Sequence, residues 1–145
     1  MTADEGRTWV VISHAAATLY MTGVIWFVQI VHYPLFSRVG QPGSSEYARE
    51  HVRRTGRVVA GPMLAELACA VAVAWVVGGP LAWIGLALVG VIWMSTWIWQ
   101  VPAHRRLEAG FDAAAHARLT RTNWVRVVAW TARSVIALQL AAAFG

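Results

Sequence analysis

Four long stretches of this chain are almost free of charged residues, and they constrain the fold more than any other feature. They cover residues 8–36, 58–77, 81–101 and 123–144. A helix that crosses a bilayer needs about 20 mainly apolar residues, and each stretch meets or nearly meets that length. Because such runs are typical of membrane helices, the sequence predicts an all-α, integral membrane four-helix bundle that forms one domain over residues 1–145.

The composition agrees with this class of protein. Charged residues make up 13% of the chain, about half of the ~25% found in ordinary soluble domains. All twelve basic residues are Arg, and the absence of Lys excludes Schiff-base chemistry and a P-loop lysine. The single cysteine, Cys69, excludes an internal disulfide. No basic stripe with interleaved aromatic residues is present, so we expect no nucleic-acid partner.

The placement of arginine predicts the orientation in the membrane. The first connection contains five Arg residues from Arg38 to Arg57, and the third contains four from Arg105 to Arg121. The second connection and the C-terminus contain none. Short Arg-rich loops stay in the cytoplasm. We therefore expect a multi-pass protein of the inner (cytoplasmic) membrane, embedded in the lipid bilayer, with both termini outside.

The two halves of the chain resemble each other. Trp26-Phe27-Val28-Gln29 is followed by His32, and Trp97-Ile98-Trp99-Gln100 is followed by His104. The pattern indicates either a duplicated helical hairpin, whose copies would be related by an axis along the membrane normal, or a chance similarity of two apolar, Arg-rich segments. Such an axis would bring the histidines of both halves together at one end of the bundle.

Two ionisable residues lie deep in the predicted spans. Glu66 is about nine residues into the second span, or ~13 Å by the helical rise, and Arg133 lies at a comparable depth in the fourth. An isolated charge at this depth is costly, so we expect Glu66 and Arg133 to form a buried ion pair. The pair would be either a structural clamp or a contact for a proton or substrate. Arg126 lies nearer the inner surface, where its side chain can snorkel to water.

Histidines gather at the predicted cytoplasmic end, and acidic residues accompany them. The histidines are His32, His51, His104 and His116, and the acidic residues are Glu46, Glu50, Glu108 and Asp112. Imidazole suits iron, copper and zinc, and bundle-core metal sites combine His with carboxylates from facing helices. We expect the four histidines to bind a metal or haem, with Glu108 and Asp112 as ligands or as partners that orient the imidazoles. His14 lies ~27 Å from His32 along the same helix, too far to share a metal.

The leading hypothesis is a metal- or haem-dependent membrane oxidoreductase that acts on a lipid-soluble substrate. The substrate would be a lipophilic small molecule or a quinone, which reaches the cytoplasmic end of the bundle from between the helices. The cofactor would be iron, copper or haem b, with zinc as a further option. The catalytic residues would be Glu108, Asp112, Asn123 and Arg126, the last two by positioning a polar head of the substrate.

Other interpretations stay open. The cluster could be a pocket for a polar substrate or quinone that holds no metal, or a solvated, ion-paired rim. The protein could also be non-catalytic, as a transporter, channel or structural subunit whose His and Arg cluster is a gate or polar rim. Four spans enclose little space, so a homodimer is also open.

The chain resembles two groups of small bacterial four-helix membrane proteins. His14, early in the first span, and the segment His32-Tyr33-Pro34-Leu35-Phe36 are similar to features of the HemJ-type protoporphyrinogen oxidases. This resemblance implies haem b held by a His and a Met, for which His14 and Met94 would be the candidates. In size and number of spans the chain also resembles the anthrone-oxygenase-like membrane proteins. No catalytic residue is carried over from either family.

Overall fold

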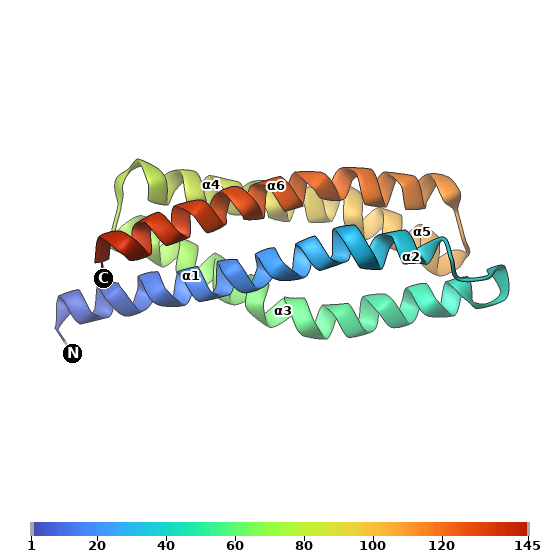
Figure 1. The fold of residues 1–145 in the computed structure, drawn as a ribbon, viewed down its shortest axis with the longest axis horizontal. Helices are drawn as coiled ribbons and strands as arrows, with labels where there is room; N and C mark the ends of the chain where they lie inside the picture. Colours follow the sequence, from blue (N-terminus) through green and yellow to red (C-terminus); the bar gives the residue numbers. More distant parts are fainter. Residues whose placement is uncertain (1, 145) are drawn as a thin grey trace.

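The chain folds into four helical rods, and each rod runs antiparallel to the one before it in the sequence (Figure 1). The computed structural model describes residues 2–144, and no strand occurs in that range. The all-α four-helix prediction is confirmed. The rods are α1 (Ala3–Phe27), η1 (Val28–His32) and α2 (Tyr33–Phe36); α3 (Ser44–Val76), preceded by η2 (Gln41–Gly43); α4 (Gly79–Ser95), η3 (Thr96–Gln100) and α5 (Val101–Ala109); and α6 (Ala113–Phe144).

The rods form a square in cross-section. α1 packs against α3 and α6, and α4 packs against the same two helices, so that α3 and α6 face each other across the centre. Both termini and the turn between α3 and α4 lie at one end, which we name the terminal end (Figure 1). The connections at residues 37–43 and 110–112 lie at the other end, which we name the histidine end.

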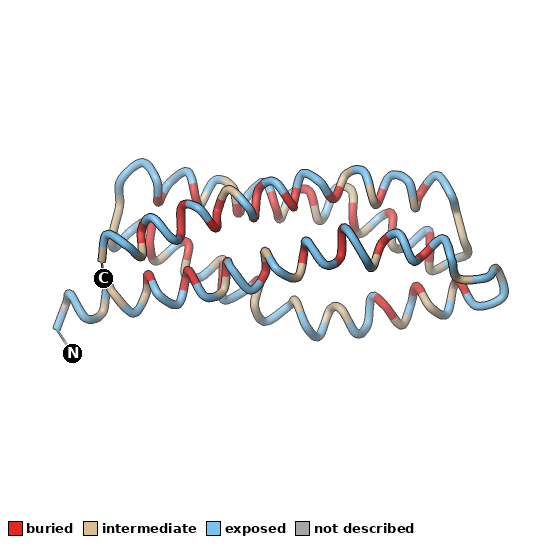
Figure 2. Tube along the Cα trace, in the orientation of Figure 1, coloured by how far each residue is buried: buried red, intermediate tan, exposed pale blue. Residues whose placement is uncertain are grey.

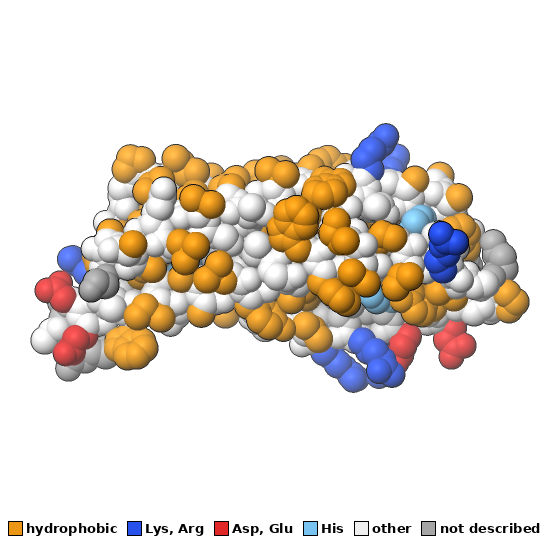
Figure 3. Space-filling model, in the orientation of Figure 1, with side chains coloured by type: hydrophobic (Ala, Val, Ile, Leu, Met, Phe, Trp, Pro, Cys, Tyr) orange, Lys and Arg blue, Asp and Glu red, His pale blue; other side chains and the backbone are white. Residues whose placement is uncertain are grey.

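All four rods are long and apolar enough to cross a membrane. The second, third and fourth rods exceed the predicted spans because their ends at the histidine end are charged helical turns, and the first rod begins earlier than predicted, at Ala3. On the face drawn in Figure 3, charged side chains gather toward the two ends and apolar side chains cover the middle. Length, composition and this distribution suggest a multi-pass membrane protein.

Turn residues set the bounds of the helices. Gly78 and Gly79 have φ values of +70° and +80°, a region that favours glycine, and they make the tight turn between α3 and α4. At the start of α6, the Asp112 carboxylate accepts hydrogen bonds from the backbone N–H groups of Ala114 and Ala115, at 2.9 and 3.0 Å. These bonds satisfy two donors that the first helical turn leaves unpaired.

The first and third rods each contain a π-helical segment close to the histidine end. Val28 and Tyr33 are five residues apart and both buried, and Ser95 and Gln100 repeat this spacing. The wider π-helical turn therefore accommodates one extra residue, and the buried face of the rod continues to point into the bundle on both sides of it. Each segment ends two residues before a proline (Pro34 and Pro102), which has no N–H to donate to an α-helical ladder.

Buried residues line the inside of the rods, with one interruption (Figure 2). Within the described chain, α3 has no buried residue between His51 and Met63. Pro62 lies in this helix, and a proline inside a helix bends it. In Figure 1 the first half of α3 runs away from α1 before the helix turns back toward the bundle. The hollows described below lie beside this stretch.

Candidate functional site

Three histidines from three rods lie in a row at the histidine end. The ring centroids of His32 and His51 are 4.3 Å apart, those of His51 and His104 are 5.1 Å apart, and both pairs are nearly parallel. η1 supplies His32, α3 supplies His51 and α5 supplies His104. We name these three residues the histidine stack. The structure thus brings together three of the four histidines in the predicted cluster.

The stack is only partly satisfied by hydrogen bonds. His51 Nδ1 lies 3.1 Å from Thr55 Oγ1, and His104 Nε2 lies 3.2 Å from the Tyr33 hydroxyl oxygen. Two buried nitrogens, His32 Nε2 and His104 Nδ1, have no hydrogen-bond partner among residues 2–144. Buried polar atoms in folded proteins are nearly always paired, so these two nitrogens require an explanation.

The fourth histidine has a different place. His116 Nε2 donates to the Tyr33 carbonyl oxygen at 2.8 Å, and its ring packs against Phe36 and Phe111. Tyr33 begins the last helical turn of the first rod, where carbonyl groups lack helical partners. His116 therefore satisfies a carbonyl group at the end of that rod, as a helix cap does.

Three of the predicted acidic and amide side chains, those of Glu50, Asp112 and Asn123, have structural partners. Asp112 caps α6, and Asn123 donates to the side-chain oxygen of Gln29 at 2.8 Å. The backbone carbonyl of Glu108 accepts from Arg49, and the Glu50 carboxylate pairs with Arg53 and Arg54, while Glu46 is exposed. In the described part of the chain, no group of three or more His, Cys, Asp or Glu residues is arranged to hold a metal ion.

Arg126 corrects one expectation from the sequence. Its side chain does not reach water, because the residue is only 8% exposed. The guanidinium carbon lies 5.2 Å from the centre of the Trp130 ring, and the group lies against the Tyr33 hydroxyl. Its Nε has no hydrogen-bond partner, and no Asp or Glu within residues 2–144 forms an ion pair with it. Arg126 and Arg133 are seven residues apart on α6 and therefore lie on the same face of the helix, which packs into the bundle.

Two hollows meet at the histidine stack. The inner cavity, of about 150 Å³, is lined by Tyr33, His51, His104 and Arg126 among others. The α1–α3 groove, of about 420 Å³, lies on the outside between these helices. The two hollows share three lining residues, Val24, Val28 and Thr55. The inner cavity is therefore separated from the outer apolar surface by a few side chains only.

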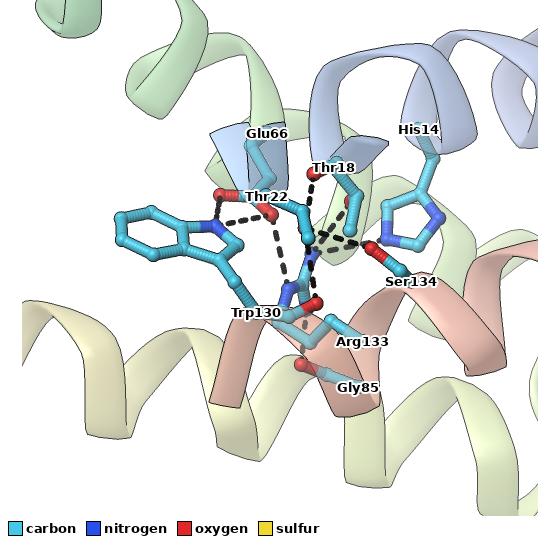
Figure 4. A network of polar contacts seen from close by, with 8 residues as sticks. All are labelled: His14, Thr18, Thr22, Glu66, Gly85, Trp130, Arg133 and Ser134. Atoms are coloured by element: carbon cyan, nitrogen blue, oxygen red, sulfur yellow. Dashed lines mark hydrogen bonds and ion pairs between the residues drawn. The ribbon is translucent and has the colours of Figure 1, made fainter. Parts of the chain in front are cut away.

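A second polar network lies at the centre of the bundle (Figure 4). Arg133 Nε lies 3.1 Å from Glu66 Oε1, so the structure places these two residues in an ion pair. The Glu66 carboxylate also accepts from the Trp130 indole N–H at 2.8 and 3.0 Å. The remaining guanidinium nitrogens contact the Gly85 carbonyl oxygen, His14 Nε2 (3.1 Å) and Thr18 Oγ1 (3.3 Å). Each guanidinium nitrogen of Arg133 has a partner, whereas His14 Nδ1 has none among residues 2–144, and the network ties α1, α3 and α4 to α6.

Sequence reasoning missed two residues of these sites, Tyr33 and Trp130, and it did not place His14 beside Arg133. A buried phenol or indole needs a hydrogen-bond partner, but nothing local distinguishes these from the other Tyr and Trp residues. His14 is buried in the central network, whereas Met94 is 61% exposed on the outside of α4. These two side chains do not face a common space.

Comparison of the chain with protein-family models, with curated proteins and with solved structures gives no match. The resemblance to the two membrane families stays a prediction.

Proposed function

We propose that this protein is a membrane-embedded, metal-dependent oxidoreductase that acts on a lipid-soluble substrate at the histidine end. The observation that carries the proposal is the histidine stack, in which two of three neighbouring imidazoles have a buried nitrogen without a partner. Imidazole is a preferred ligand of iron, copper and zinc. His32, His51 and His104 would be the ligands, and His116 would not, because its Nε2 is bound to the Tyr33 carbonyl.

A single ion suits the site better than a haem. The inner cavity of about 150 Å³ corresponds to about five water-sized groups at ~30 Å³ each, far less than a haem macrocycle requires. The stacked rings do not yet point their nitrogens at one position. Binding would therefore include rotation of the rings, and the ion would stabilise the rotated arrangement.

The surroundings of the stack suit the removal of hydrogen from a bound substrate. Tyr33 and His104 are joined by a hydrogen bond beside the cavity, and such a phenol–imidazole pair can pass on a proton. We propose that a substrate SH₂ gives two electrons and two protons to a membrane quinone, which balances as SH₂ + quinone → S + quinol. The histidine end would face the cytoplasm of a cell with an inner membrane, because nine of the twelve Arg residues lie at that end.

Metal analysis of the purified protein tests the proposal. The full chain is purified in mild detergent, reconstituted separately with Fe²⁺, Cu²⁺ and Zn²⁺, and its metal content and absorption spectrum are measured. We expect about one ion per chain for at least one metal, loss of that ion in His51→Ala, and retention in the matched control His116→Ala. A metal-free protein after all three treatments, or equal loss in both variants, would overturn the proposal.

A further inference from the structure

We infer that the inner cavity and the α1–α3 groove together bind an amphiphile with one long apolar chain and a carboxylate head, and that Arg126 holds the head. This inference names the substrate class of the site proposed above. It rests on the proposed function only for the reaction, because the binding that it describes needs no metal.

The first argument is the unbalanced charge on α6. This helix has two buried arginines, and Arg133 is paired with Glu66 and three further acceptors. Arg126 is comparably buried, but its neighbours are the Tyr33 hydroxyl and the Trp130 ring, and within the described residues it has no anionic partner. A buried cation without a counter-charge is strongly unfavourable. A carboxylate matches the planar fork of a guanidinium and would supply the missing charge.

The second argument is that the other arginine beside these hollows is already engaged. Arg54 is one of the residues that line the α1–α3 groove. Its Nε donates to the Glu50 carboxylate at 2.6 Å, and its side chain is 73% exposed to the surroundings. Arg126 is therefore the cation that an acidic head would neutralise.

The third argument is the size of the two hollows. At ~30 Å³ per water-sized group, the inner cavity of about 150 Å³ holds a carboxylate and about two methylene groups. By the same measure, the α1–α3 groove of about 420 Å³ holds a further ~14 such groups. Together they fit a fatty acid of roughly sixteen carbons. This room suits a single-chain acid better than a phospholipid, whose phosphoglycerol head is larger than the inner cavity holds.

The fourth argument is the apolar character of the groove. Gly23, Phe27 and Val58 are among its lining residues, and all three are exposed on the outside of the bundle. The Val24, Val28 and Thr55 side chains lie between this groove and the inner cavity. When these three side chains move aside, a chain that lies in the groove would have its head beside Arg126, and a lipid-soluble acid would reach the site from a bilayer by this route.

Binding of radiolabelled palmitate to the full-length, metal-free protein tests the inference, with immobilised protein in detergent and a proximity readout. We expect saturable binding near one molecule per chain, competed by unlabelled palmitate and not by methyl palmitate. Arg126→Met should weaken binding at least tenfold, whereas the matched control Arg121→Met, exposed on the same helix, should bind as the wild type does. Equal binding by both variants, or equal competition by the methyl ester, would overturn the inference.

A second pair of variants keeps the test decisive if Arg126→Met fails to fold. A side chain at Gly23 would extend into open space in the groove, and one at Gly90 would extend into open space on α4. Gly23→Leu should therefore weaken palmitate binding without loss of folding, and Gly90→Leu should leave it unchanged. Unchanged binding in Gly23→Leu would contradict the placement of the chain.

The metal and palmitate assays fail separately. Palmitate binding without metal would overturn the metal proposal and leave this inference intact. Metal binding without palmitate binding would do the reverse. His51→Ala should lose the metal and keep the palmitate, which distinguishes the two roles in one variant.

Discussion

Arg133 shows how a charge is kept inside a bundle of this kind. Its side chain is 0% exposed, and Glu66, its ionic partner, is 3% exposed. Each nitrogen of the guanidinium has an acceptor, and Trp130 donates to the Glu66 carboxylate from the other side. Removal of one partner of a buried pair leaves an uncompensated charge. We therefore expect the network to act as a structural clamp, the first of the two roles that the sequence left open.

Neutralising Glu66 alone should destabilise the protein. Glu66→Gln keeps the size of the side chain and an acceptor for Trp130, but it leaves the Arg133 charge unbalanced. We expect a loss of about 3–5 kcal/mol in the free energy of unfolding, measured by denaturation in detergent. Arg133→Gln should have a loss of similar size.

The double variant Glu66→Gln, Arg133→Gln is the control for this prediction. It removes both charges, so it should be more stable than either single variant, with a positive coupling between the two sites. Additive losses would mean that the two residues stabilise the bundle independently, and the clamp would then be wrong.

At the residue scale, the sequence supports some predictions and not others. Depth in an apolar span implies a partner for Glu66, and Arg133 is the one cation at that depth. The hydrogen-bond partner of His116 could not be predicted from the sequence. It depends on where the first rod ends and leaves its Tyr33 carbonyl without a helical partner. The burial of Arg126 was missed for a similar reason: its distance from the predicted surface allowed water contact, and only packing excludes it.

At the scale of elements, α3 differs from the other helices. Three turns in its first half contribute no buried residue, and the two hollows lie beside them. Pro62 breaks the hydrogen-bond ladder at the end of this stretch. The apolar runs of the sequence predict the four rods. They do not predict the π segments, because one additional residue in a single helical turn changes the hydrophobic period too little to be recognised.

Replacing Pro62 should test whether the bend in α3 keeps the site open. In Pro62→Ala the helix regains a hydrogen bond and loses a steric conflict, so the free energy of unfolding should rise by up to about 3 kcal/mol. The straighter helix should lie closer to α1 and weaken palmitate binding. Unfolding in detergent and the palmitate assay measure the two effects.

Pro80→Ala is the matched control for the bend. Pro80 lies in the first turn of α4, where a proline removes no helical hydrogen bond. Both stability and binding should stay near wild type. Stronger palmitate binding in Pro62→Ala would contradict the proposed role of the bend.

At the scale of the whole molecule, charge is distributed very unevenly between the two ends. Nine of the twelve Arg residues lie at the histidine end, two (Arg126 and Arg133) are inside the bundle, and Arg7 is near the N-terminus. The terminal end has Asp4 and Glu5 beside that single Arg. A bilayer that separates a cytoplasm from the outside would orient such a molecule with its histidine end inward.

Labelling of single cysteines should reveal this orientation. Cys69→Ala provides a cysteine-free chain, into which Ser37→Cys or Thr2→Cys is introduced, because both positions are exposed and lie at opposite ends. On intact spheroplasts, a membrane-impermeant maleimide should label Thr2→Cys and should label Ser37→Cys only after permeabilisation. The reverse pattern would place the histidine stack on the outer side and contradict the predicted orientation. Equal labelling of both positions would indicate a mixed orientation, and the charge difference between the ends would then be too small to direct insertion.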